Sequence, residues 1–213
     1  GTPAGTAAAQ YAALVADKEL DCMQTGWAVS PVLALYFNHK GWSAMVRYDF
    51  RSAIKLTNST KVDGTGLFPD GARTPYDQPA MLTTALSKRF VDRVTLTAEY
   101  HYYFDKQAHW ENAFSTTIPK QDLVNTGTME YLLGVEFDVT RNVLLSCGVQ
   151  YTDYDVKDEF HSELSYQLDA VSVGLGEAFR LCRFLRLNVG VMHGFFLPKS
   201  VTSEVSGVPY TTR

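Results

Sequence analysis

Strict alternation of apolar and polar residues over about fifteen positions, from Trp42 to Leu56, is the clearest pattern in the chain. Even positions carry mainly apolar or aromatic side chains, and odd positions from 47 onward carry mainly charged ones. Because successive side chains of a β-strand point to opposite faces, this pattern predicts one long strand with an oily face and a charged face. The usual strand has only about 5–6 residues, so this length favours a sheet that crosses a membrane.

The same alternation recurs in seven other segments, and together they predict an all-β, antiparallel protein. These segments cover residues 27–37, 80–90, 94–104, 128–139, 143–154, 164–181 and 185–196. The strands form four hairpins with short internal turns, and the connections between hairpins are longer. Short turns at one end and long loops at the other are typical of a transmembrane β-barrel. A soluble sandwich would show shorter strands, with turn signals every ~8–12 residues.

One segment, residues 6–19, predicts a helix instead, because it is rich in alanine and contains no internal Gly or Pro. The chain opens with Gly1 rather than with a methionine, and its first residues do not read as a signal peptide. We therefore expect a mature or excised piece of a longer protein.

Composition narrows the class of protein without changing the predicted fold. The 213 residues carry a net charge of −4 and 20% charged side chains, which argues against a disordered chain and against a basic nucleic-acid binder. No apolar run reaches the ~18 residues of a membrane helix, and barrel strands do not need one because half of their side chains are polar. Twelve Tyr and twelve Phe suit strands and the aromatic bands of a membrane interface.

The sequence shows no enzyme or cofactor signature. It contains no serine nucleophile elbow, no Cys/His pair at a useful spacing and no glycine-rich phosphate loop. The three cysteines lack a metal-binding spacing, and their odd number argues against a complete disulfide framework. We therefore expect a protein that is not an enzyme and that binds neither a metal nor a cofactor.

Four stretches of the sequence resemble a known family. They are residues 26–31 (Gly-Trp-Ala-Val-Ser-Pro), 47–52, 78–80 and 130–137 (Glu-Tyr-Leu-Leu-Gly-Val-Glu-Phe). They are similar to the FadL/TodX family of outer-membrane hydrophobic-compound transporters, and in particular to its Bacteroides-type members. The resemblance implies an antiparallel transmembrane barrel of about fourteen strands, plugged by an N-terminal hatch. It also implies passive uptake of long-chain fatty acids or aromatic hydrocarbons.

The family's topology, laid over this chain, implies a single β-barrel portion over residues 1–213. Its expected parts are a helical external loop at residues 1–24, eight strands in four hairpins at residues 25–196, and an external loop or tail without a further strand at residues 197–213. The hatch, the earlier strands and the last strand of the family barrel have no counterpart here. In the family, ligand lands in a hydrophobic groove between two external loops and then passes to a pocket in the lumen.

Arg47, Arg51 and Lys55 lie on the charged face of the predicted strand Trp42–Leu56, and each is about 13 Å from the next along the strand. As a ladder in the lumen, they could pair with the carboxylate of a fatty acid. The alternative is that they pair with acidic side chains of the same interior, since a polar lumen has to balance its charges. The sequence leaves both interpretations open.

Glu99, His101 and Tyr103 alternate on the polar face of their strand and are further candidates for lining the lumen. A histidine beside a carboxylate could shuttle a proton, and the alternative is structural hydrogen bonding. One histidine with one carboxylate does not make a metal site.

The external loops offer a second candidate ligand site. Apolar side chains of the predicted helix and of a later long connection could form a landing groove for an acyl chain, or could pack the loops on themselves. The residues concerned are Tyr11, Leu14, Val15, Leu67 and Phe68. An aromatic cluster near the end of one strand is expected instead to form an interfacial band. Its members are Tyr100, Tyr102, Phe104 and Trp110.

Our main functional hypothesis is passive uptake of hydrophobic small molecules through the bacterial outer membrane. The expected partners are a fatty acid-like hydrophobic ligand and outer-membrane lipid, with no nucleic acid, and we expect a monomer. The alternative is a non-transporting structural or adhesive barrel whose long loops bind a partner outside the cell. A third hypothesis is a soluble β-rich domain whose polar face lies in water.

Overall fold

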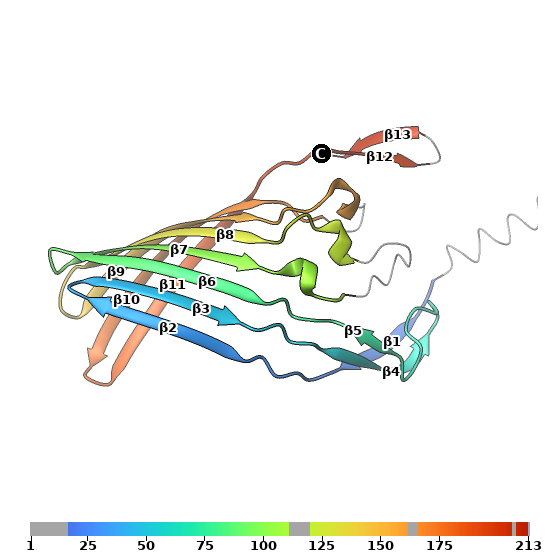
Figure 1. The fold of residues 1–213 in the computed structure, drawn as a ribbon, viewed down its shortest axis with the longest axis horizontal. Helices are drawn as coiled ribbons and strands as arrows, with labels where there is room; N and C mark the ends of the chain where they lie inside the picture. Colours follow the sequence, from blue (N-terminus) through green and yellow to red (C-terminus); the bar gives the residue numbers. More distant parts are fainter. Residues whose placement is uncertain (1–16, 111–119, 162–165, 206–207, 213) are drawn as a thin grey trace, which may run out of the picture.

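The computed structural model describes residues 17–110, 120–161, 166–205 and 208–212, and it shows an all-β protein (Figure 1). Its main element is a sheet of eight antiparallel strands in the order β11-β10-β9-β8-β7-β6-β3-β2. The strands are β2 (Val32–His39), β3 (Trp42–Asp49), β6 (Met81–Phe90), β7 (Val94–Tyr103), β8 (Met129–Asp138), β9 (Val143–Asp153), β10 (Ala170–Cys182) and β11 (Leu185–Phe196). The prediction of an antiparallel all-β fold is confirmed.

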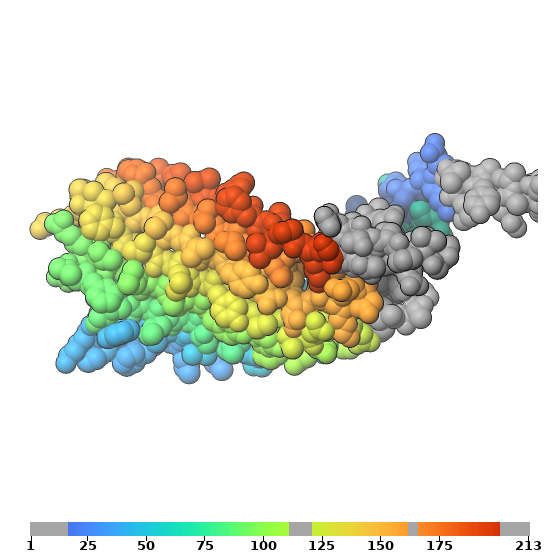
Figure 2. Space-filling model, turned by 90° about the horizontal axis from the view of Figure 1, so that it is seen from above, coloured from blue at the N-terminus to red at the C-terminus, as the bar shows by residue number. Residues whose placement is uncertain are grey.

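The sheet curls into an open trough. Figure 1 shows β10 and β11 passing behind β2 and β3, and Figure 2 shows the strands as successive bands of colour across one elongated body. Twist between neighbouring strands gives such a sheet its curvature. β2 and β11 form the two edges, and neither has a second partner strand among the residues that the structure describes. The fold is a portion of a β-barrel wall, and the wall is not closed.

All four hairpin turns lie at one end of the trough, and the long connections lie at the other (Figure 1). The β2–β3 turn has a two-residue loop, since His39 pairs with Trp42. Lys40 and Gly41 both have positive φ, at 46° and 78°, as in the tight turns whose twist matches that of the flanking strands. The asymmetry between short turns and long connections that the sequence predicts is therefore present in the structure.

The long connections carry secondary structure of their own. A small sheet has the order β1-β4-β5, and a separate hairpin joins β12 to β13. The elements are β1 (Leu20–Thr25), β4 (Lys55–Asp63), β5 (Arg73–Pro75), β12 (Val201–Val205), β13 (Val208–Thr212) and the 3-10 helices η1 (Asp105–Gln107), η2 (Lys120–Leu123) and η3 (Asp158–Phe160). Figure 1 shows the small sheet beyond the end of β2 and β3.

The strand predicted over Trp42–Leu56 is wrong as a single element, because the structure divides it between β3 and β4. The pairing register nevertheless continues across the division: β3 pairs with β6, β4 pairs with β5, and the bridge between Ser52 and Gln78 falls on the same register. Pro79 lies beside this bridge, and a proline has no N–H to donate to the ladder. The small sheet therefore continues the β3–β6 hairpin beyond the trough.

Three other expectations about the connections differ from the structure. β1 forms part of the segment expected as a helical loop at residues 1–24, and β4 and β5 occupy the connection expected to lack strands. β12 and β13 lie in the tail at residues 197–213, where the sequence predicts no strand. These strands have only three to nine residues, and alternation over so few positions is hard to distinguish from loop composition. The predicted helix at residues 6–19 falls largely outside the described residues.

The two faces of the trough are exposed in the opposite way to those of a soluble sheet. On the face that we call outer, Leu133, Leu175 and Val191 are 62%, 65% and 67% exposed. On the inner face, the side chains of His101 and Glu130 are only 18% and 17% exposed. No large apolar side chain is fully buried among the described residues. The trough therefore has no hydrophobic core of its own.

Aromatic side chains border the outer face at both ends. At the long-connection end, the rings of Tyr102 and Phe104 meet edge to face with centroids 4.8 Å apart, and Tyr100 lies on the same face. At the short-turn end, Lys88 Nζ lies 4.8 Å from the ring centroid of Trp42. Two aromatic bands that flank an apolar stretch are typical of the outward face of a membrane barrel.

Candidate functional site

A hydrogen-bonded network of side chains lies on the inner face across β7, β8 and β9. His101 Nε2 lies 2.7 Å from Glu99 Oε1, and His101 Nδ1 lies 2.8 Å from Glu130 Oε2. Tyr103 donates its hydroxyl to Glu130 Oε2 at 3.2 Å, and the Gln150 amide donates to Glu130 Oε1 at 2.9 Å. A histidine donates from both ring nitrogens only when it is protonated, so this geometry suits an imidazolium between two carboxylates.

Strand register brings the members of this inner-face network together. His101 lies directly opposite Thr83 on β6 and Glu130 on β8, and Glu130 lies opposite Thr152 on β9. Cβ atoms of directly opposed residues are about 4.5–5.5 Å apart, so side chains of this length reach one another. The network therefore ties three neighbouring strands together on the polar side of the trough.

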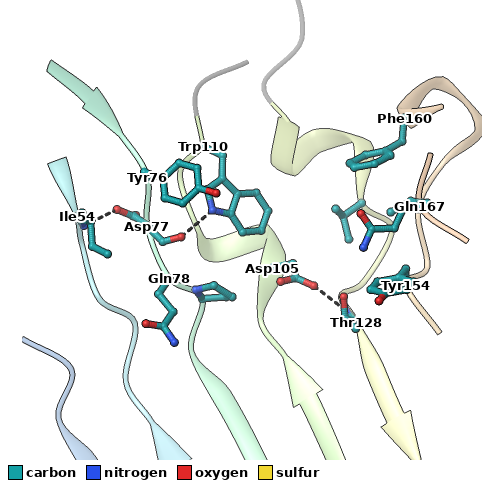
Figure 3. Close-up of a pocket in the computed structure, with 13 residues that line it drawn as sticks. Ile54, Tyr76, Asp77, Gln78, Asp105, Trp110, Thr128, Tyr154, Phe160 and Gln167 are labelled. Atoms are coloured by element: carbon teal, nitrogen blue, oxygen red, sulfur yellow. Dashed lines mark hydrogen bonds between the residues drawn. The ribbon is translucent and has the colours of Figure 1, made fainter. Parts of the chain in front are cut away.

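A cavity of about 500 Å³ lies at the long-connection end of the trough, and we call it the mouth cavity (Figure 3). Its volume falls in the range of about 300–1,000 Å³ that small-molecule sites occupy. Its lining residues are Ile54, Tyr76, Asp77, Gln78, Pro79, Asp105, Trp110, Val124, Thr128, Tyr154, Val156, Phe160 and Gln167. Eight of the thirteen are apolar or aromatic, and five are polar or charged: Asp77, Gln78, Asp105, Thr128 and Gln167.

The mouth cavity lies directly beyond the inner-face network. Asp105 follows Tyr103 by two residues, and Thr128 precedes Glu130 by two residues. Thr128 directly precedes β8 and continues its inward phase, and the hydrogen bond from its backbone N–H holds Asp105, the first residue of η1, beside it. The network and the mouth cavity are therefore consecutive sections of one inward-facing surface.

Asp105 joins the end of β7 to the start of β8. Its carboxylate is nearly buried, and Oδ2 accepts a hydrogen bond from the backbone N–H of Thr128 at 2.7 Å. The approach depends on Gly127, which has a φ of 147° and where a Cβ would overlap the carbonyl oxygen of Tyr103. Glycine at position 127 therefore allows Asp105 and Thr128, both in the lining of the mouth cavity, to lie side by side.

Asp77 organises the opposite side of the mouth cavity. Its Oδ1 accepts a hydrogen bond from the backbone N–H of Ile54 at 3.2 Å. Its Oδ2 accepts one from the backbone N–H of His109 at 3.2 Å and lies 3.4 Å from Arg51 Nη1. The indole N–H of Trp110 donates to the carbonyl oxygen of Asp77 at 2.6 Å, which fixes the aromatic ring against the cavity (Figure 3). Asp77 thus acts as a hub for the connection before β6 and the connection after β7.

Aromatic side chains face the mouth cavity from two sides. Figure 3 shows Tyr76 and Trp110 on one wall and Phe160 and Tyr154 on the other. These residues come from three different connections, which meet only in the folded chain. The sequence pattern does not reveal the cavity for this reason, and it predicts Trp110 in the interfacial band. The structure corrects that assignment, because Trp110 lines the mouth cavity.

The predicted ladder of cations is not one continuous row. Arg47 stays in the trough and pairs with Asp49 at 2.6 Å. Arg51 lies past the end of β3 and pairs with Asp77 at 3.4 Å. Lys55 begins β4 and lines a separate cavity beside the small sheet. The contacts of the two arginines agree with charge balance, and a role of any of the three in ligand binding stays a prediction.

Glu99, His101 and Tyr103 are brought together by the structure, as their common face suggests. Glu130 and Gln150 complete the network, and the sequence pattern alone does not group them with these three residues. Alternation in β8 places Glu130 on the polar face, but only the strand register sets it opposite His101. Ligand binding by these residues also stays a prediction.

The proposed landing groove is only partly described. Leu67 and Phe68 lie in the connection between β4 and β5, where Leu67 is exposed and Phe68 is half-buried. Tyr11, Leu14 and Val15 fall outside the described residues. The groove therefore stays a prediction.

The part of the chain that the structure describes shows neither a metal-binding cluster nor a helix that could cross a membrane. There, no group of three or more His, Cys, Asp or Glu side chains is placed to hold a metal ion. In the same residues, no helix is both long enough and apolar enough to cross a membrane.

The fold and its inward-facing surface define a class of protein, a portion of an antiparallel β-barrel wall. Among solved structures, the chain is similar to the crystal structure of a Pseudomonas aeruginosa FadL homologue, with a TM-score of 0.57 and 14% sequence identity. The match covers 83% of this chain and 46% of that chain, so this chain spans less than half the length of the homologue. At this identity, the likeness shows a FadL-like fold alone. No protein-family model and no curated protein matches the sequence.

Proposed function

We propose that the protein forms part of a bacterial outer-membrane barrel that takes up hydrophobic small molecules passively. The observation that carries the proposal is the exposed apolar outer face, bordered at both ends by aromatic side chains. Apolar surface of this extent is rare on soluble monomers, and lipid would cover it in a membrane. The FadL-like fold and the resemblance of the sequence to the FadL/TodX family support the same assignment.

The free edges of β2 and β11 support a membrane barrel in a different way. A strand edge in lipid leaves backbone N–H and C=O groups unpaired, and each such group costs several kcal/mol. Further strands would pair with these edges and close the wall. The closed barrel would then hold the inner-face network in its lumen, away from lipid.

The route of a ligand follows the inward-facing surface. A hydrophobic molecule would enter at the long-connection end, bind in the mouth cavity, and move along the inner face. The cavity supplies aromatic contacts with few polar groups, which suits an apolar molecule. Passive movement of this kind needs no cofactor and no catalytic residue.

Uptake of the dye N-phenyl-1-naphthylamine by whole cells tests the proposal, because an intact outer membrane slows entry of this apolar molecule. Cells that lack the gene should accumulate the dye more slowly, and re-expression of the natural protein should restore the rate. Trp110→Ala should restore it only in part, since Trp110 lines the mouth cavity.

Trp42→Ala is the matched control, because Trp42 lies at the short-turn end and does not line the mouth cavity. It should restore uptake fully at equal amounts of protein in the membrane. An equal rate with and without the gene would contradict the uptake proposal and favour the structural or adhesive alternative. Recovery of the natural protein in the soluble fraction without detergent would contradict the membrane assignment itself.

A further inference from the structure

The mouth cavity contains carboxylates but no cationic side chain among its described lining residues. Asp77 and Asp105 belong to the lining, whereas Lys, Arg and His do not occur in it. Both carboxylates are nearly buried, at 6% and 8% exposure. The described lining therefore offers a ligand two carboxylates and no cationic side chain.

Three cations near the cavity are engaged by other groups. Arg51 pairs with the Asp77 carboxylate at 3.4 Å and offsets its charge. Near the rim, Lys157 donates to a backbone carbonyl oxygen at 2.8 Å, and Lys199 pairs with a surface carboxylate at 3.3 Å. Asp105 has no ion-pair partner among the described residues, and its Oδ2 accepts a hydrogen bond from a backbone N–H. No described cation therefore pairs with this carboxylate of the cavity lining.

The remaining polar groups of the cavity wall are neutral. Gln78 and Gln167 present side-chain amides (Figure 3). Burial raises the pKa of Tyr154, and the negative charges of Glu130 and Asp169 raise it further. The Tyr154 hydroxyl therefore keeps its proton at neutral pH and can donate a hydrogen bond. The described lining can satisfy one neutral polar group of a ligand but offers no cation to pair with an anion.

We propose that the mouth cavity selects neutral apolar ligands that carry one hydrogen-bonding group, such as an alcohol, and rejects carboxylate anions of the same size. The inference rests on the proposed function, because it names which hydrophobic molecules the uptake site accepts. Trp110 and Phe160 cover the apolar part of the ligand, and the amides and hydroxyls bind its polar end. A carboxylate would lose its water beside Asp105 without gaining a cation, and that loss is unfavourable.

The test compares 1-octanol with octanoate, which share a chain length and differ in charge at about pH 7.5. Binding is measured by titration calorimetry on the full chain in lipid nanodiscs, with empty nanodiscs as the blank for partition into lipid. We expect octanol to bind at least about tenfold more tightly than octanoate. Asp105→Asn removes the charge and keeps the shape, so it should strengthen octanoate binding severalfold and leave octanol binding unchanged.

Asp92→Asn is the matched control, since Asp92 lies in the β6–β7 turn at the far end of the trough and should affect neither ligand. Octanoate that binds as tightly as octanol would overturn the selectivity, and the uptake proposal would stand if dye entry still depends on Trp110. If neither ligand binds, the inference is overturned as well. In that case, dye entry that is independent of the gene would show that the proposed function has failed with it.

Discussion

The outer and inner faces of the trough are built from the same strands, yet different interactions stabilise them. Leu133 points outward and is 62% exposed, while its neighbour Leu132 points inward between Glu99 and Gln150 on the adjoining strands. On the outer face, apolar side chains such as Leu133, Leu175 and Val191 stay 62%, 65% and 67% exposed and depend on the surrounding medium. On the inner face, hydrogen bonds such as those around Glu130 satisfy the polar side chains within the protein.

The two faces therefore depend on different surroundings, and the described residues contain no single hydrophobic core. A soluble sheet buries its apolar face and leaves its polar face in water. Here the apolar face has no protein cover among the described residues, and the less exposed face is the polar one. In the membrane barrel that we propose, lipid takes the place of a hydrophobic core. Substitutions on opposite faces of one strand should therefore have opposite consequences.

The largest expected effect comes from arginine at neighbouring positions of β8. Leu133→Arg places a charge in the middle of the outer face, and in lipid it should lower the free energy of unfolding by about 2–4 kcal/mol. Leu132→Arg is the matched control, because it places the same charge opposite Glu99 on the inner face and should cost much less. Denaturant titration of the protein refolded into lipid vesicles measures both. Equal costs at the two positions would break the assignment of faces.

The next effect concerns the inner-face network. Glu130→Ala removes the acceptor of hydrogen bonds from His101, Tyr103 and Gln150. We expect a loss of about 2 kcal/mol, because hydrogen bonds to a charged group contribute more than neutral ones. Glu136→Ala on the same strand should cost little, since Glu136 has no hydrogen bond or ion pair in the described part of the chain. The same denaturant titration decides, and equal losses for both variants would show that the network does not stabilise the fold.

A smaller effect, of opposite sign, is expected at Glu177. Its register places it between Leu145 and Val189, on the same face as their apolar side chains. A carboxylate on a lipid face near the interface costs about 0–1 kcal/mol, so Glu177→Leu should stabilise the protein by up to that amount. Glu136→Leu on the inner face should bring no gain. If Glu177→Leu lowers the stability instead, the carboxylate of Glu177 makes a polar contact and does not face lipid.

The smallest effect is local and depends on pH. The Thr65 hydroxyl, with the backbone N–H groups of Gly66 and Phe68, lowers the pKa of Asp63 at the end of β4. Because the pKa of Asp63 is lower in the folded state, its carboxylate stabilises the loop at any pH above the unfolded-state pKa of about 3.9. That stabilisation should be lost as the pH falls through the lower folded value.

Hydrogen exchange at the Gly66 and Phe68 amides, followed from about pH 6 to pH 2, measures this change. Protection relative to the intrinsic exchange rate should fall over the acidic part of that range in the natural protein. Asp63→Asn should show weaker protection throughout and no step with pH. A step that persists in the variant would assign the titration to another group. Unfolding of the trough itself should stay unaffected, because Asp63 lies outside the large sheet.

Much of the fold follows from the period-two pattern, since each long alternating segment forms a strand of the large sheet. The strand predicted over Trp42–Leu56 is too long, because the alternation of apolar and polar residues continues through the break between β3 and β4. Pro79, on the facing segment, interrupts the ladder there, and only the register shows that the two segments face each other. The short strands β12 and β13 escaped notice because five residues carry too little periodicity.

In the candidate site as well, the sequence predicts contacts between near neighbours on one strand but not contacts between distant segments. Glu99, His101 and Tyr103 could be grouped from sequence because neighbours two apart on a strand share a face. Trp110 could not be placed, because its partner Asp77 comes from a connection that lies 33 residues away in the chain. The charges of Arg47 and Arg51 were visible, but their partners were not, so the sequence could not decide between ligand binding and charge balance.

The sequence by itself determined the strands, their two unlike faces and the short turns, because alternation and turn chemistry act over a few neighbouring residues. The tertiary structure decided which strands pair, where the large sheet gives way to the small one, and how three connections enclose the mouth cavity. It also decided that Asp77 has a cation beside it and that Asp105 has none among the described residues. These outcomes depend on contacts between distant segments, which register and loop packing create only when the chain folds.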